Sequence, residues 1–229
     1  MRSFTKTTLS LATAGLLIAG LSACSTTADA TAPAENSSSS SSSSSEGATP
    51  KALASIPALS GVDTSVLLDA DFAAALTSLG LTPGTVGTAT LTDGSLHFPI
   101  TGGNVDYYDP EEDYRPFVQG SIEHEGSGFS LTAGETTVEL TNFTIDPGTS
   151  KLFGDVSVNG ESAATQVLLF NLYGGTLKPL QMDGDNAILE GTTVHISAEA
   201  AGLLNDTFMT DAVADQLLVG IAKITVATK

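Results

Sequence analysis

The chain has 229 residues, with 26 acidic side chains against 8 basic ones and a formal net charge of −18. This acidity argues against nucleic acids and anionic lipid surfaces as partners, because like charges repel. It is compatible with cations, with basic partners, or simply with solubility in a salty environment.

The N-terminus carries the pattern of a bacterial lipoprotein signal peptide. Arg2 and Lys6 precede an apolar stretch at 9–21, which is shorter than the ~20 residues that a membrane-spanning helix needs. The stretch ends in Leu-Ser-Ala-Cys, which resembles a lipobox whose cysteine, Cys24, is acylated and becomes the mature N-terminus. We therefore expect a lipid-anchored protein of the cell envelope, although an ordinary signal peptide with an incidental cysteine is the alternative. Because Ser25 follows the cysteine in place of Asp, the resemblance favours the outer membrane if the cell has one.

A tether is expected between the cysteine and the folded domain. Residues 25–50 consist largely of Ser, Thr, Ala, Asp and Glu, with an unbroken serine run at 37–45. Such a segment buries too little apolar surface to offset its ordering entropy, so it should behave as a flexible coil. The sequence thus divides into a signal peptide at 1–23, the lipidated cysteine and tether at 24–60, and one domain at 61–229.

From residue 84 onward, short strand patterns alternate with turn signals. "SLHFPI" (95–100) places alternate apolar residues on one face, and "DVSVNG" (155–160) runs into Asn-Gly, a strong hairpin signal. In "VELTNFTID" (138–146) the alternation slips at Asn142, which predicts a bulge. The pattern predicts a mainly β fold, an antiparallel β-sandwich or barrel.

Two segments break this pattern and match each other. "SVLLDADFAAAL" (65–76) and "TVHISAEAAGLL" (193–204) each read as a short strand, an N-capping Asp or Ser, and an Ala/Leu-rich helix. A further strand follows each one, at 86–92 and 219–225. We therefore predict two short helices in a repeated strand–helix–strand unit at each end of the domain, with the two units pairing to close the fold. Chance similarity between Ala-rich helices is the alternative.

No catalytic motif stands out. Cys24 is expected to carry lipid, and the chain has no Gly-x-Ser-x-Gly elbow, no phosphate-binding glycine motif and no zinc pattern. The histidines His97, His124 and His195 are scattered along the chain. We therefore expect a protein that is not an enzyme.

The stretch "DYYDPEEDYRP" (106–116) is the most unusual of the domain. It is expected to form a long loop between two strands, where its tyrosines offer large contact area at low entropic cost. A solvated acidic loop is the alternative. Calcium would need six to eight converging oxygen ligands, and the spacing is not that of an EF-hand. The weak calcium candidates are Asp106, Asp109, Glu111, Glu112 and Asp113.

His124 lies on the apolar face of "FVQGSIEHEG" (117–126), together with Val118 and Ile122. A satisfied core histidine and a ligand-binding role both fit this position. The segments that carry a family resemblance are "TVGTATLTDGSLHFPITGGNVD" (85–106), "GSIEHEGSGFSLTAGETTVELTNFTID" (120–146), "KLFGDVSVNG" (151–160) and "ISAEAAGLLNDTF" (196–208). Together they resemble a group of secreted or anchored bacterial β-proteins of unknown function.

Around His124 the chain also loosely resembles the Htaa domain of actinobacterial haem-uptake proteins, in which a histidine supports a tyrosine ligand to haem iron. The matching residues are Gly120, Ser121, Ile122, His124, Gly126, Leu131 and Thr132. The Htaa domain supplies its tyrosine from an N-terminal segment, but the corresponding region here, 62–84, has none. The resemblance therefore implies a haem site built from His124 and the tyrosines nearest in sequence, with one arginine for the propionates. These further candidates are Tyr107, Tyr108, Tyr114 and Arg115.

Three hypotheses follow from the sequence. The first is a membrane-anchored, non-enzymatic lipoprotein whose β-rich binding or structural domain contacts an unknown envelope protein or polymer. The second is a haem or metal capture module of the Htaa type. The third is a calcium-stabilised, adhesion-like domain that uses the acidic stretch 106–116.

Overall fold

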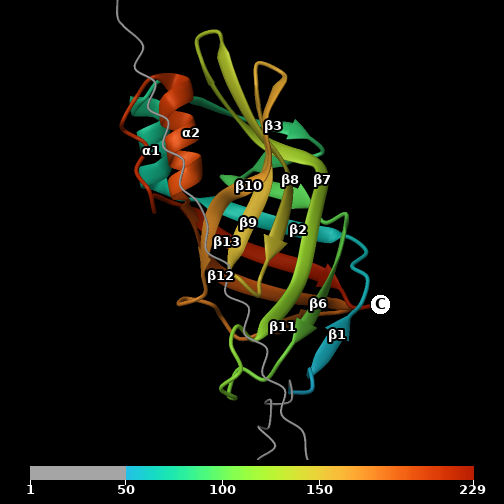
Figure 1. The fold of residues 1–229 in the computed structure, drawn as a ribbon. Helices are drawn as coiled ribbons and strands as arrows, with labels where there is room; N and C mark the ends of the chain where they lie inside the picture. Colours follow the sequence, from blue (N-terminus) through green and yellow to red (C-terminus); the bar gives the residue numbers. More distant parts are fainter. Residues whose placement is uncertain (1–49) are drawn as a thin grey trace, which may run out of the picture. The chain divides into compact units, whose positions relative to one another are not determined.

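The computed structural model describes residues 50–229, which form one curled antiparallel sheet with two helices at one end (Figure 1). This confirms the prediction of a mainly β domain with two short helices. The predicted signal peptide, the predicted lipidation site Cys24 and most of the predicted tether lie outside the described residues. The predicted end of the tether at residue 60 is wrong, because Ala54–Ile56 forms a strand of the sheet and Leu59 is buried in the core. No helix within residues 50–229 is long and apolar enough to cross a membrane.

The elements follow one another along the chain as strands, interrupted by one helix near each end. The first part contains β1 (Ala54–Ile56), β2 (Val62–Leu68), α1 (Ala70–Ser78), β3 (Thr82–Gly87), β4 (Thr90–Thr92), β5 (Ser95–Pro99) and β6 (Gly102–Tyr107). The second part contains β7 (Val118–Ala133), β8 (Thr136–Asp146), β9 (Lys151–Val158), β10 (Glu161–Tyr173), β11 (Gln181–Asp183), β12 (Asn186–Ile196), α2 (Ala198–Phe208) and β13 (Leu218–Ala227).

The sheet has the strand order β1-β6-β7-β8-β9-β10-β12-β13-β2-β5-β4, with β3 added to β7 and β11 to β12. The connection from β5 to β6 brings the two ends of this sheet together. The N–H of Ile100 donates to the carbonyl of Val62 on β2, and the N–H of Thr101 donates to the carbonyl of Glu123 on β7. Two consecutive residues thus join β2 to β7, so the sheet curls around an enclosed core.

The two strand–helix–strand units pair as predicted, through β2 and β13. Because β2 and β12 both run antiparallel to β13, they point the same way, and the helices that follow them lie at the same end (Figure 1). The predicted N-caps are confirmed: Asp69 accepts hydrogen bonds from two N–H groups of α1, and Ser197 accepts one from Ala200. The strand expected at 86–92 is wrong in detail. Its residues divide between β3, which pairs with β7, and β4, which pairs with β5.

A line of bulges bends the middle of the sheet. The predicted bulge on β8 is confirmed by a register shift between Thr141 and Thr144, and β7 and β10 shift register beside it. The extra residues Asn142 and Gln166 adopt left-handed backbone with φ of 52° and 46°. Asp155 accepts hydrogen bonds from the side chains of both, at 2.9 Å and 3.3 Å. The strands therefore change direction together, which helps the sheet to curl.

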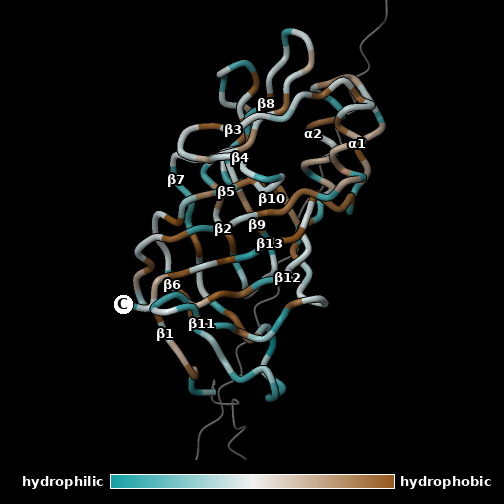
Figure 2. The backbone as a smooth tube through the Cα atoms, turned by 180° about the vertical axis from the view of Figure 1, so that it is seen from behind, coloured by the Kyte–Doolittle hydropathy of each residue, from teal (hydrophilic) through white to brown (hydrophobic). Residues whose placement is uncertain are grey.

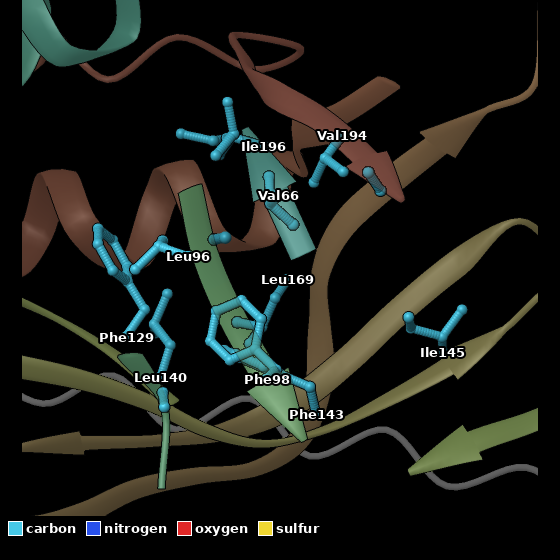
Figure 3. Packing of buried hydrophobic residues seen from close by; sticks show 14 of the residues in the cluster. Val66, Leu96, Phe98, Phe129, Leu140, Phe143, Ile145, Leu169, Val194 and Ile196 are labelled. Carbon is cyan, nitrogen blue, oxygen red and sulfur yellow. The ribbon is translucent and has the colours of Figure 1, made fainter. Parts of the chain in front are cut away.

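Hydrophobic and hydrophilic residues alternate along the strands (Figure 2), as expected for a sheet with one buried face. The inward residues form one core with the buried faces of both helices. Phe98 and Phe143 pack edge to face near its centre, with ring centroids 5.2 Å apart (Figure 3). Phe72 and Leu76 of α1 and Leu204 of α2 fill the core at the helix end. At the opposite end none of the helices formed by residues 50–229 covers the inward face.

Candidate functional site

His124 is a core residue with its hydrogen bonds satisfied. Its side chain is only 1% exposed. Nδ1 lies 3.3 Å from the carbonyl oxygen of Phe143, and Nε2 lies 2.8 Å from Oγ1 of Thr64. Because a carbonyl can only accept, Nδ1 carries the proton and Nε2 accepts from the threonine hydroxyl. Burial lowers the pKa of His124 to about 4, against smaller raising effects from the Phe143 hydrogen bond and the Asp63 charge, so the ring is neutral near pH 7.

The space next to His124 is too small for a cofactor. It is a cavity of about 80 Å³ between the helices and the sheet, with an almost entirely apolar lining. This volume compares with roughly 30 Å³ for one water molecule in the liquid. Of the two interpretations of His124, the structure therefore supports the core histidine.

The predicted tyrosines lie far from this histidine. Tyr107 ends β6 and pairs in register with Val118, whereas His124 lies six residues further along β7. At ~3.4 Å per residue this separates Tyr107 from His124 by about 20 Å. Tyr108 is buried against Tyr114, with ring centroids 4.6 Å apart. The structure thus does not assemble the predicted haem ligands, because the strand register separates residues that are close in sequence.

Arg115 is engaged within the acidic loop, which we define as residues 108–117 between β6 and β7. Its guanidinium donates to the carbonyls of Pro110 at 2.7 Å, of Tyr114 at 2.9 Å, and of Glu112. It also lies 5.7 Å from the centroid of the Phe117 ring. The long loop between two strands is confirmed, although Asp106 and Tyr107 belong to β6 and not to the loop. Arg115 organises the loop and is not free to meet a propionate.

The acidic stretch does not build a calcium site. Within residues 50–229, no group of three or more His, Cys, Asp and Glu side chains is placed to hold a metal ion. Oδ1 of Asp109 accepts a hydrogen bond from the N–H of Glu111, and the next carboxylates along the loop are exposed. The candidates Asp106, Asp109, Glu111, Glu112 and Asp113 therefore do not converge as calcium requires.

The remaining histidines serve local contacts. Nδ1 of His97 lies 2.7 Å from Oδ2 of Asp63 on the neighbouring strand. Nδ1 of His195 donates to the carbonyl of Gln216 at 2.9 Å, and its ring packs edge to face against Tyr173. Neither histidine adds to a shared site with His124.

A large cavity opens at the end of the sheet opposite the helices. We call it the end cavity; its volume is about 500 Å³. Its wall comes from β1, β6, β7, β8, β10, β11, β12 and β13 and from the segments beside them, and it includes Ile56, Val105, Phe117, Met182, Ala187 and Leu189. The wall contains hydroxyl groups but no charged side chain. In the described part of the chain the two helices fill the core at the other end, and this end is left open.

Tyr107 is the one sequence-predicted candidate that lies in the end cavity. Its ring packs edge to face against Phe117, with centroids 5.7 Å apart. Burial raises the pKa of Tyr107, and the negative charge of Asp109 raises it further. The phenol is therefore neutral and able to donate a hydrogen bond. Sequence reasoning missed the other wall residues, because the strands that carry them meet only after folding.

No protein-family model and no curated protein matches this chain. Among solved structures, the C-terminal domain of HtaA from Corynebacterium glutamicum is similar, with a TM-score of 0.51 and 14% sequence identity over 74% of this chain and 98% of that one. The heme binding protein HtaB from the same organism gives a TM-score of 0.48 and 10% identity over 76% of this chain and 96% of that one. At such low identity, the likeness to the HtaA domain shows a shared fold.

Proposed function

We propose that this protein is a non-enzymatic carrier of the cell envelope that binds a hydrophobic small molecule in the end cavity. The observation that supports this proposal is the cavity itself, with about 500 Å³ of space and an apolar wall. Ligand sites in proteins typically have volumes of ~300–1,000 Å³ and a few neutral or charged polar groups among apolar side chains. The Tyr107 hydroxyl is the polar group best placed to orient a ligand.

The same wall argues for binding without catalysis. A general acid or base works best with a pKa near the working pH. The wall offers hydroxyl groups and no carboxylate, imidazole or amine. The only titratable side chain among them is Tyr107, whose pKa is raised away from neutrality. A wall of apolar side chains and neutral hydroxyl groups suits a protein that binds a ligand and releases it unchanged.

Lipidation at Cys24 would hold the carrier at the membrane, in the outer membrane if the cell has one. The lipobox pattern and the serine-rich tether support this part of the proposal. The chain also enters the described domain at β1, and Ala54 and Ile56 of that strand belong to the cavity wall. The first described strand therefore borders the cavity.

Haem is a second candidate ligand for the same cavity. The position of Tyr107 in the wall favours it, since a tyrosine phenolate is an axial ligand type for haem iron. The sequence resemblance to Htaa domains and the fold shared with the HtaA domain also support it. If haem is the ligand, Tyr107 binds the iron, and Met182 is a further wall residue beside the bound haem. His124 is buried elsewhere in the core and keeps a structural role.

The carrier proposal is tested by probe binding. The mature chain with Cys24→Ser is titrated with a neutral fluorescent probe, N-phenyl-1-naphthylamine. We expect saturable binding that Ala187→Phe weakens, because this residue belongs to the cavity wall and a phenyl ring there takes up part of the space. Ala163→Phe is the matched control, since Ala163 is exposed on β10 and outside the wall. Equal binding by both variants would contradict the proposal.

A parallel haemin titration tests the second candidate. If haem binds in the end cavity through Tyr107, the Soret band shifts on binding and the shift is lost in Tyr107→Phe and reduced in Ala187→Phe. A Tyr114→Phe variant is the control, because Tyr114 packs on Tyr108 outside the wall. An absent shift, or a shift that survives Tyr107→Phe, excludes this version.

A further inference from the structure

Two segments that line the end cavity also carry carboxylates, and we call the edge of the cavity that they form its mouth. Pro116 and Phe117 of the acidic loop and Met182 of β11 belong to the cavity wall, and the same two segments carry exposed or half-exposed acids. These acids are Asp109, Glu111, Glu112, Asp113 and Asp183. None of them takes part in the ion pairs formed within residues 50–229. No ion pair within these residues therefore neutralises their charges.

Three cations near the mouth form contacts with other groups and do not pair with these acids. Arg115 donates to backbone carbonyls of its own loop. Nζ of Lys178 lies 2.7 Å from Oε1 of Glu190, and Nζ of Lys229 lies 2.6 Å from Oδ1 of Asp185. These three cations therefore do not neutralise the acids at the mouth.

Three further cations border the wall. Lys223 precedes Ile224 of the wall and lies opposite Glu190 in the register of β12 and β13. Lys51 is exposed, lies three residues before Ala54 of the wall and forms none of the ion pairs within residues 50–229, so it offsets one of the acids.

The third cation, Lys151, follows Ser150, which belongs to the wall, and it lies opposite Asp146 in the register of β8 and β9. The two residues form no ion pair within residues 50–229, but the Asp146 carboxylate on the adjacent strand lowers the effect of this cation on the cavity. The negative field reaches the cavity, because the charge of Asp109 contributes to the raised pKa of Tyr107.

We propose that the ligand of the end cavity is a cationic amphiphile, with an apolar body inside the cavity and an ammonium group at the acidic mouth. This inference rests on the proposed function and names the ligand class of the same site. The apolar wall accepts an alkyl or aromatic body, and the carboxylates attract a positive head group. At physiological ionic strength the Debye length is ~8 Å, so the charges nearest the mouth dominate this selection. Fatty acids and haem, which carry carboxylates, meet repulsion at the same place.

Three amphiphiles with the same twelve-carbon chain test the inference: dodecyltrimethylammonium, dodecyl sulfate and uncharged dodecyl maltoside. Each amphiphile is titrated against N-phenyl-1-naphthylamine bound to the mature Cys24→Ser chain, at low and at high salt. The amphiphile concentration stays below its critical micelle concentration, and loss of probe fluorescence measures displacement. We expect the ammonium compound to bind about tenfold more tightly than the sulfate at low salt, and the ratio to shrink at high salt. Ala187→Phe should weaken the binding of all three.

Charge variants locate the effect. The triple variant Asp109→Asn, Glu112→Gln and Asp183→Asn removes three charges at the mouth. A control triple removes the same charge from exposed sites outside the wall: Asp93→Asn, Glu161→Gln and Asp211→Asn. We expect only the first triple to reduce the preference for the ammonium compound.

The outcomes separate the two proposals. Probe binding with equal or tighter binding of the sulfate overturns this inference and leaves the carrier function standing. Equal effects of the two triple variants overturn it as well, since the preference would then reflect net charge alone. Absence of probe binding in the parent chain contradicts the carrier function, and the inference falls with it.

Discussion

Nε2 of His124 on β7 lies 2.8 Å from the hydroxyl of Thr64 on β2, and the pair crosses the inside of the curled sheet. These strands are not neighbours in the sheet, so the hydrogen bond links its two ends. The Htaa resemblance implies a tyrosine beside this histidine, whereas the partner of Nε2 in this structure is the hydroxyl of a threonine. A threonine hydroxyl buried in an apolar core has no route to a haem iron. The hydrogen bond between His124 and Thr64 therefore stabilises the contact between β7 and β2 inside the curled sheet.

Removal of the Thr64 hydroxyl should destabilise the fold. Thr64→Val keeps the shape of the side chain but leaves Nε2 of His124 buried without a donor, which costs about 1–3 kcal/mol. Thr64→Ser keeps the hydroxyl and should cost less. Urea unfolding of both variants measures the difference. A Thr64→Val variant at least as stable as Thr64→Ser would contradict the role of this hydrogen bond.

The burial of His124 should make stability fall in mild acid. Its pKa is about 4 in the folded protein and ~6.5 in an unfolded chain, so between these values the unfolded state binds more protons. Stability is therefore unaffected by this group above about pH 6.5, and it falls by about 3 kcal/mol as the pH drops to 4. Unfolding curves at pH 7 and pH 4.5 measure the loss. His124→Asn should reduce the pH dependence, and an unchanged slope in that variant would refute the assignment.

Some of this architecture was readable from the sequence because it depends on neighbouring residues. The N-caps Asp69 and Ser197 precede their helices directly, and the phase slip at Asn142 marks its bulge within one strand. The end cavity depends on long-range pairing, since β1 meets β6 and β12 meets β13 only in the folded sheet. For the same reason the sequence placed Tyr107 near His124, although the register of β6 and β7 separates them.

Asp155 should be important for the bend in the sheet. It accepts hydrogen bonds from the side chain of Asn142 at 2.9 Å and from the backbone N–H of Gln166 at 2.9 Å. Burial alone would raise its pKa, but the hydrogen bonds from Asn142 and Gln166 outweigh burial and hold the pKa below its usual value. Asp155→Ala removes the acceptor at two bulges, and we expect a loss of about 1–3 kcal/mol at pH 7.

The control for this prediction is Asp113→Ala, because Asp113 is exposed in the acidic loop and should tolerate the change within about 0.5 kcal/mol. The contribution of Asp155 should be complete above the unfolded pKa of an aspartate and decline as the pH falls further, since its folded pKa is the lower one. Thermal unfolding at pH 7 and pH 3 follows this change. Equal stabilities of the two variants at pH 7 would show that the bulges hold without the carboxylate.

Cys24 should decide whether the protein stays with the membrane. With the cysteine acylated, more than one lipid chain gives stable anchoring, so the wild type should sediment with membranes and enter the detergent phase of Triton X-114. Cys24→Ala should release the chain into the aqueous phase, because the acidic domain has no attraction for anionic lipids. Ser25→Ala is the control that keeps the acylated residue. Membrane retention of Cys24→Ala at the wild-type level would mean that an uncleaved N-terminal segment or a protein partner provides the attachment, and the lipobox interpretation would be wrong.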